Sequence, residues 1–164
     1  MTGRYLIALG SNVRHHRHGA PERVLPAALD ALAAAGITVE ARSPILRSAP
    51  LGPSRRRYAN AAALLRTRLE PTALLDVLKA VEADFGRRRA GARWRARVLD
   101  LDIVLWSGGA WSSPDLTIPH PAFRTRAFVL RPAVAIAQAW RDPLTGLTLR
   151  HLCARLTRPR PAPR

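Results

Sequence analysis

Two stretches of the chain place apolar residues at the spacing of one helix face, and this pattern limits the fold more than any other feature. The first runs from Pro21 to about Ala35, and Gly36 is typical of the position just beyond a helix end. The second begins at Pro71 and closes at Gly86. Their apolar stripes are Val24, Leu25, Ala28, Leu29 and Leu32, and Leu74, Leu75, Leu78, Val81 and Phe85. The pattern predicts two amphipathic helices, the first perturbed at Pro26.

Short β-type runs surround these two helices. "RYLIALGSN" precedes the first helix, "ITVEARSPILRS" (interrupted by Pro44) and "YANAAALLRTRL" lie between the two, and "VLDLDIVLW" follows the second. "SGG" then turns the chain toward a short return strand at "AW". The order β-α-β-β-α-β predicts an α+β fold, the ferredoxin-like sheet-and-helix sandwich. A short helix around 126–137 is expected as a C-terminal addition.

The length of 164 residues fits one domain, which we place at 1–157, followed by a Pro/Arg tail at 158–164 that we expect to be disordered. Cys153 is the only cysteine, so no intrachain disulfide can form. The apolar run near the amino terminus is too short for a signal peptide, and none is long enough to span a bilayer. We expect a cytoplasmic protein. The formal charge of +16 is weak evidence of function, because a bias toward arginine can reflect coding composition.

The last predicted strand carries two carboxylates. Side chains alternate across a strand, so Asp100 and Asp102 share one face while Leu99, Leu101 and Ile103 share the other, which we take as the core side. Two neighbouring carboxylates repel each other unless a cation or an arginine lies between them. Surface acids on a half-exposed sheet are the alternative interpretation. The apolar composition of the rest of the strand argues against it.

A basic loop precedes this strand and carries Arg87, Arg88, Arg89, Arg93, Arg95 and Arg97. Guanidinium groups bind phosphate oxygens well, and carboxylates hold Mg²⁺. Together they indicate a phosphoryl-transfer site. No Walker A sequence is present, so side chains must bind any nucleotide. The loop has almost no apolar anchor except Trp94, and we expect it to close over ATP as a lid.

Six motifs occur in one order along the chain: "IALGSN", "SAPLGP", "YANAA", "VEADFGR", "RWRARVLDLDIVL" and "LTIPHPAFRTRAFVL". In these motifs the chain resembles the 6-hydroxymethyl-7,8-dihydropterin pyrophosphokinase family over nearly its full length. The resemblance implies a ferredoxin-like fold and an enzyme, a diphosphotransferase that moves a diphosphate from ATP to a pterin hydroxymethyl group in folate biosynthesis. It also implies two Mg²⁺ ions and no nucleic-acid or membrane partner; we expect a monomer.

The resemblance assigns residues to the phosphates and the nucleotide. Asp100 and Asp102 match the metal-binding aspartates, and Arg97 and Arg87 complete the catalytic set. Arg87 and Arg89 match loop arginines that close over ATP, while Arg97 matches one that contacts the transferring phosphates. The positions expected to bind ATP are Lys79, Glu82, Arg89, Arg93, Trp94, Arg97, Ile103, Thr117, His120 and Arg126.

A flat bicyclic pterin needs aromatic faces and paired hydrogen-bonding groups. Tyr58 and Phe128 match the stacking residues of the family, and Asn60 matches the side chain that binds the ring edge. The loop expected to complete the pocket is Ser48, Ala49, Pro50 and Leu51. Without the resemblance, Phe128 would be assigned to the core.

The chain departs from the family pattern at several positions. Arg95-Ala96 replaces the usual Gly-Pro after the tryptophan, Lys79 stands where glutamine is common, and Pro121 stands where an aromatic can occur. The run Arg55–Arg57 replaces a polar loop beside the pterin pocket. None of these removes a residue that the chemistry requires.

Two other interpretations remain open at this point. A pI near 11.9 with a ferredoxin-like sheet also suits an RNA-binding module, although such a module needs aromatic residues on its central strands. "HHRH", with His15, His16 and His18, resembles a metal-binding tract, but no nearby Cys, Asp or Glu completes a site.

Overall fold

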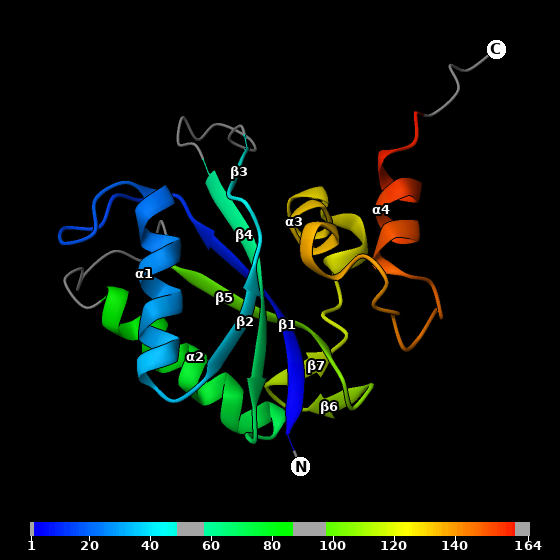
Figure 1. Ribbon diagram of the computed structural model, residues 1–164, viewed down its shortest axis with the longest axis horizontal. Coiled ribbons are helices and arrows are strands. Elements are labelled where there is room, and N and C mark those ends of the chain that lie inside the picture. The colour runs from blue at the N-terminus through cyan, green and yellow to red at the C-terminus, as the bar shows by residue number, and fades with distance from the viewer. Residues whose placement is uncertain (1, 49–57, 87–97, 160–164) are drawn as a thin grey trace.

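The computed structural model describes residues 2–48, 58–86 and 98–159. Its main sheet has five strands within these ranges, all antiparallel, in the order β2-β4-β1-β5 with β3 also paired to β4 (Figure 1). The strands are β1 (Gly3–Ser11), β2 (Thr38–Arg42), β3 (Leu46–Ser48), β4 (Tyr58–Thr67) and β5 (Asp100–Trp106). The mixed α/β architecture predicted from the sequence is confirmed. The expected tail lies mostly outside the described residues.

Helices cover both faces of this sheet. α1 (Pro21–Ala34) and α2 (Pro71–Gly86) lie on one face, and α3 (Ala127–Ala137) and α4 (Leu149–Thr157) lie on the other (Figure 1). Each pair of helices buries its own apolar cluster against the strands. β1, β4 and β5 therefore lie between two cores. Within the described ranges, no helix is long and apolar enough to cross a membrane.

The two predicted helices form where their apolar stripes place them. Every predicted α1 stripe residue is buried, and α1 continues through Pro26 without interruption. Pro26 thus does not break the helix. The missing N–H of Pro26 costs one hydrogen bond to the first turn, and the packing of Val24, Leu25 and Ala28 against the sheet offsets that loss.

The predicted second strand is two strands, β2 and β3, both paired to β4. Pro44 cannot donate to a ladder, so the pairing stops near it. Ser43 bridges the break. Its N–H donates to the carbonyl of Ala62 at 2.9 Å, and its Oγ accepts from the N–H of Ala62 at 2.9 Å.

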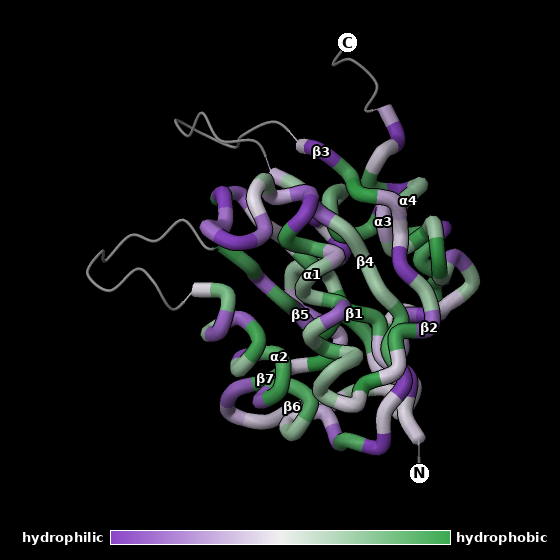
Figure 2. Tube along the Cα trace, turned by 60° about the vertical axis from the view of Figure 1, so that its left-hand side comes forward, coloured by the Kyte–Doolittle hydropathy of each residue, from purple (hydrophilic) through white to green (hydrophobic). Residues whose placement is uncertain are grey.

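β5 contains a register shift. Leu6 of β1 pairs with Leu105 and Ile7 pairs with Ile103, so Val104 is an extra residue in β5. Leu101 and Ile103 pack under α1 and α2, whereas Val104 and Leu105 both join the cluster beneath α3 and α4. Figure 2 shows that β5 is hydrophobic along much of its length and is interrupted by a hydrophilic stretch.

Beyond β5 the chain adds elements of its own. The predicted return strand, β6 (Trp111–Ser113), pairs with β7 (Leu116–Ile118) and not with β5. A 3₁₀ turn, η1 (Phe123–Thr125), leads into α3, which lies where the sequence predicts it. The sequence pattern did not predict β7, η1 or α4 (Leu149–Thr157). Thr148 caps α4 by accepting a hydrogen bond from the N–H of His151.

Candidate active site

α3 and α4 leave one end of their sheet face uncovered, and a cleft of about 860 Å³ opens there. Its floor is formed by β1, β4 and β5, one wall by β3, and the opposite wall by residues 125–131. Of the predicted site residues that the structure describes, the cleft brings together Ser48, Tyr58, Asn60, Asp100, Asp102, Arg126 and Phe128.

The middle of the floor is backbone. Gly10 of β1 pairs with Asn60 of β4 on one side and with Asp100 of β5 on the other. Neighbouring strands lie about 4.8 Å apart, so Asn60 and Asp100 are separated by roughly 10 Å across Gly10. A Cβ on Gly10 would lie 3.4 Å from Asn60 Oδ1. Glycine therefore keeps the floor flat between the two polar side chains.

Asp100 and Asp102 lie on the cleft face of β5, as predicted, and both are half-buried. Asp102 also lines a second hollow of about 320 Å³, together with Ile103, Thr117 and His120. His120 Nε2 lies 3.9 Å from Asp102 Oδ2. His120 Nδ1 accepts a hydrogen bond from the N–H of Ala122 at 3.1 Å, so a neutral His120 directs its N–H toward the carboxylate. The second hollow, like the cleft, thus reaches Asp102.

Glu82 contacts the backbone of β5. Its Oε1 accepts a hydrogen bond from the N–H of Leu101 at 2.6 Å, and Leu101 lies between the two aspartates. A carboxylate on α2 thereby fixes the outer edge of the strand that carries both acids. Lys79, which the resemblance also assigns to the ATP site, is exposed on α2. It is not among the described residues that line the cleft or the second hollow.

Asn60 is 6% exposed, and its Nδ2 donates to Ser48 Oγ at 3.1 Å. That bond holds the amide plane of Asn60 against β3. Tyr58 pairs with Ser48 and shares the strand face of Asn60, as predicted. On the opposite wall, the guanidinium of Arg126 lies over the ring of Phe128, 5.8 Å from the ring centroid. Two aromatic residues therefore line the cleft, Tyr58 from the floor strand β4 and Phe128 from the wall at 125–131.

Several predicted residues lie outside the described ranges. They are Ala49, Pro50, Leu51, Arg87, Arg89, Arg93, Trp94 and Arg97. The substitutions at Arg55–Arg57 and Arg95-Ala96 also lie there, as does the expected lid. Their roles stay predictions.

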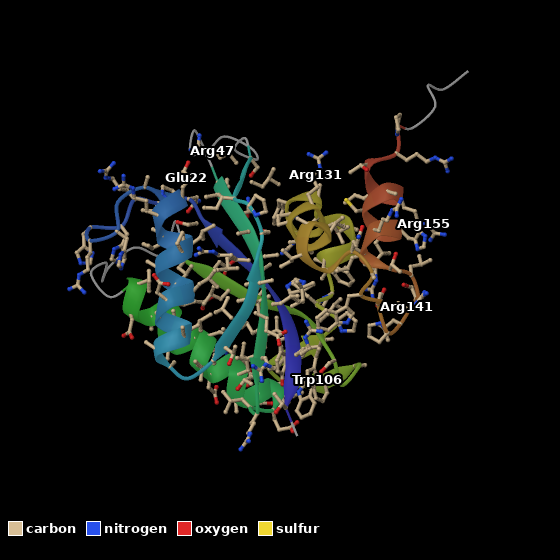
Figure 3. All side chains as sticks on the ribbon, viewed as in Figure 1. Glu22, Arg47, Trp106, Arg131, Arg141 and Arg155 are labelled. Atoms are coloured by element: carbon tan, nitrogen blue, oxygen red, sulfur yellow. The ribbon has the colours of Figure 1, made fainter. Side chains whose placement is uncertain are left out.

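Sequence reasoning missed two arginines of the cleft. Arg47, on β3, is ion-paired with Glu22 of α1 at 3.0 Å, and Arg131 lies on α3. Both are exposed and lie at the same end of the molecule (Figure 3). Arg131 could have been found from its spacing, since it lies about one helical turn beyond Phe128.

The histidine loop packs against α2. His15 is 5% exposed, contacts the ring of Phe85, and accepts hydrogen bonds at Nδ1 from the N–H groups of Arg17 and His18, both at 3.1 Å. Burial lowers the pKa of His15, and the positive charges of His16, His18 and Arg17 lower it further. Among the described residues, no group of three His, Cys, Asp or Glu side chains is placed to hold a metal ion. The geometry gives His15 a structural role.

The comparisons with known proteins agree with the resemblance. A family model described as 7,8-dihydro-6-hydroxymethylpterin-pyrophosphokinase matches residues 6–138. The chain belongs to this pyrophosphokinase family. The 2-amino-4-hydroxy-6-hydroxymethyldihydropteridine pyrophosphokinase of Pseudomonas aeruginosa is 41% identical over 145 residues, covering 87% of this chain and 86% of that protein. The Methylorubrum extorquens enzyme of the same name is 39% identical over 158 residues, covering 95% and 94%.

Some relatives are longer. The Synechocystis pyrophosphokinase is 43% identical over 115 residues, and the match covers 70% of this chain but 58% of that protein. Among solved structures, the HPPK-DHPS protein of Plasmodium falciparum superposes with a TM-score of 0.73 at 12% identity, covering 94% of this chain and 41% of that one. That likeness supports the fold alone. Membership of the pyrophosphokinase family makes the chain an enzyme of the transferase class.

Proposed function

We propose that this pyrophosphokinase uses the cleft to transfer the diphosphate of ATP to the hydroxymethyl group of 6-hydroxymethyl-7,8-dihydropterin, giving AMP and the pterin diphosphate in folate biosynthesis. Family membership supports the reaction. The observation in this chain that carries the proposal is the position of Asp102, which lines both the cleft and the second hollow. Two substrates held on either side of one carboxylate can meet beside it.

The pterin occupies the cleft. Its ring lies against Tyr58, on the floor strand β4, and against Phe128, on the wall at 125–131, since both residues line the cleft. Asn60 binds the ring edge, because its bond to Ser48 presents the amide in a fixed orientation. The separation of roughly 10 Å between Asn60 and Asp100 leaves room for a bicyclic ring and its hydroxymethyl group. The loop of Ala49, Pro50 and Leu51 completes this pocket.

The nucleoside of ATP occupies the second hollow, against Ile103, Thr117 and His120. Its phosphates extend past Asp102 toward the cleft, where Arg126 lies on the wall. Arg87, Arg89, Arg93 and Arg97 bind the phosphates, and Trp94 packs near the nucleotide. Glu82 acts through β5, which it holds by the N–H of Leu101.

Asp100 and Asp102 fit a magnesium site, because both are carboxylates on one strand face, half-buried at the floor of the cleft. Asp100 and Asp102 would hold two Mg²⁺ ions there, and these would neutralise the negative charge of the ATP phosphates during transfer. The protein contributes the orientation: the floor directs the pterin hydroxyl toward the phosphates for in-line attack.

The strand order β2-β4-β1-β5, with two helices packed on one face, supports a ferredoxin-like classification. We further propose that residues 1–157 act as one domain, in a cytoplasmic monomer with no nucleic-acid or membrane partner. The RNA-binding alternative is not favoured, since carboxylates on the open sheet face repel a phosphate backbone.

The test is incubation with ATP, Mg²⁺ and 6-hydroxymethyl-7,8-dihydropterin, followed by separation of nucleotides and pterins. AMP and the pterin diphosphate are expected in equal amounts, and chelation of Mg²⁺ should stop the reaction. Formation of ADP would contradict attack at the β-phosphorus. Thermal stabilisation by single-stranded RNA, but not by Mg·ATP with a pterin, would favour the RNA-binding alternative.

A further inference from the structure

A partly buried ion pair joins η1, just before the wall of the cleft, to the segment between α3 and α4. Asp142, in the segment between α3 and α4, is 0% exposed. Arg124 of η1 donates to it twice, from Nε to Oδ2 at 2.7 Å and from Nη2 to Oδ1 at 2.8 Å. Thr145 Oγ1 donates to Oδ2 at 2.7 Å, and the N–H of Leu144 donates to Oδ1 at 3.1 Å. Each carboxylate oxygen thus accepts two hydrogen bonds.

The charge state of Asp142 follows from these contacts. Burial raises the pKa of Asp142, but the hydrogen bonds from Arg124, Thr145 and Leu144, with the positive charge of Arg124, outweigh it and hold the pKa below its usual value. The pair is therefore ionised at neutral pH. Removing Arg124 would leave the fully buried carboxylate of Asp142 without its compensating charge.

The surroundings of Asp142 are held by backbone bonds. The N–H of Asp142 donates to the carbonyl of Leu147 at 2.9 Å, and the N–H of Gly146 donates to the carbonyl of Asp142 at 2.8 Å. These two bonds close the turn at 142–147 and thereby hold the carboxylate of Asp142 in place. The family model that the chain matches ends at residue 138, so this turn lies beyond the matched region.

The other partner of the pair, Arg124, lies in η1 directly before the cleft wall at 125–131. Its guanidinium lies 4.7 Å from the ring centroid of Phe123, which is fully buried. Thr125 and Arg126 follow directly, and Phe128 lies in the first turn of α3. Arg126, the N-cap of α3, makes no side-chain capping hydrogen bond. Arg124 connects this turn to the segment before α4 by its two side-chain hydrogen bonds to Asp142.

We propose that Asp142 is a positioning residue for the pterin site: through Arg124 it fixes the wall that carries Arg126 and Phe128. This inference rests on the proposed function, which places the pterin against Phe128. The alternative is that the pair stabilises the fold without affecting ligand geometry. The two differ in what a substitution changes: a positioning role changes substrate binding in the folded protein, that of the pterin most of all, whereas a stabilising role changes the folded fraction only.

The main variant is Asp142→Asn, which keeps the shape but removes the charge and presents an N–H₂ group to donors. We expect the KM for the pterin to rise on the order of 10- to 100-fold while kcat changes far less, as for a small misplacement of a binding wall. Arg124→Lys keeps the charge but loses the two parallel bonds, so its KM should lie between those of the wild type and Asp142→Asn. If Asp142→Asn does not fold, Arg124→Lys tests the proposal in its place.

Leu32→Ala is the matched control, because Leu32 is fully buried on α1 in the opposite core. It should lower Tm without changing the KM for the pterin. Hydrogen exchange of residues 125–131 gives a readout independent of turnover: it should accelerate in Asp142→Asn relative to β1, and not in Leu32→Ala.

The outcomes separate this inference from the proposed function. If the wild type forms no pterin diphosphate, the proposed function fails, and faster exchange of 125–131 in Asp142→Asn still tests whether the pair holds the wall. If the wild type is active but folded Asp142→Asn has an unchanged pterin KM, the positioning role is wrong. Unchanged exchange of 125–131 would overturn it as well.

Discussion

The strands β4, β1 and β5 present two faces that differ in what they contribute. Toward α1 and α2 they carry Tyr5, Ile7, Leu9, Ala61, Ala63, Leu65, Leu101 and Ile103, all buried. Toward the cleft, the alternate positions at the same strand ends carry Gly10, Asn60, Asp100 and Asp102. Adjacent residues on a strand thus have different roles: those that face α1 and α2 stabilise the fold, and those that face the cleft supply the groups for the chemistry. The cleft face can hold like charges and a bare glycine because the opposite face supplies the apolar burial.

The largest effect is expected from changing the chemistry of the cleft face alone. Asp102→Asn should lower turnover by at least about 10³-fold, because Mg²⁺ requires anionic oxygen ligands there. The free energy of unfolding without ligands should stay the same or rise slightly, since the substitution removes repulsion from Asp100. Steady-state kinetics and urea unfolding measure the two quantities. A folded variant with near-normal turnover would remove the metal role.

A change on the opposite face should give the reverse result. Leu65 of β4 is fully buried toward α1 and α2, and Leu65→Ala should cost about 2–5 kcal/mol of unfolding free energy. The folded fraction should keep its kcat and both KM values. Unfolding curves with activity assays well below Tm check this. A large loss of kcat in the folded protein would show that the two faces are not separable.

Glu82 tests whether the helices contribute to the cleft face. Glu82→Ala leaves the N–H of Leu101 without its acceptor, which should cost about 1–3 kcal/mol, and should lower kcat as Asp100 and Asp102 lose their alignment. Glu82→Gln keeps an acceptor and should recover most of the loss. Equal increases in the KM for ATP in both variants would instead indicate that the carboxylate contacts the nucleotide.

The smallest effect concerns pH. Because the pKa of His15 is lowered in the folded state, folding favours the neutral ring. The stability that depends on it is complete above the unfolded pKa of about 6.5 and is lost as the pH falls below that value toward the folded pKa. Tm measured from pH 8 to pH 5 should fall more in the wild type than in His15→Asn. His151→Asn, at an exposed position, is the control and should behave like the wild type.

The sequence was most informative where local periodicity decides the structure. Alternation along β5 placed Asp100 and Asp102 on one face with Leu101 and Ile103 on the other, and the same rule joined Tyr58 to Asn60. It could not reveal the extra residue Val104, because a bulge depends on the register of the partner strand. The family resemblance supplied Phe128, whose apolar neighbours suggested a core position.

Contacts between distant segments could not be predicted from such patterns. The bond from Leu101 to Glu82 spans 19 residues and the pair of Arg124 and Asp142 spans 18, and neither leaves a periodic trace. Asp142 in "WRDPLTG" has the composition of an ordinary turn, and only the fold shows that it is buried. Glu82 was expected to line the nucleotide site, and the structure shows the backbone contact that it makes.

The distance from Asn60 across Gly10 to Asp100 determines how long a substrate the floor of the cleft can accommodate. This distance is set by two backbone hydrogen-bond spacings, so side-chain substitutions elsewhere in the cleft can change affinity without changing the reach from ring edge to reacting group. On the proposed placement of the pterin, a substrate analogue with one more methylene before its hydroxyl would fill the same pocket and overshoot the phosphates. The spacing of the sheet strands would then determine the selectivity for substrate length. Substitutions of individual side chains change that spacing least.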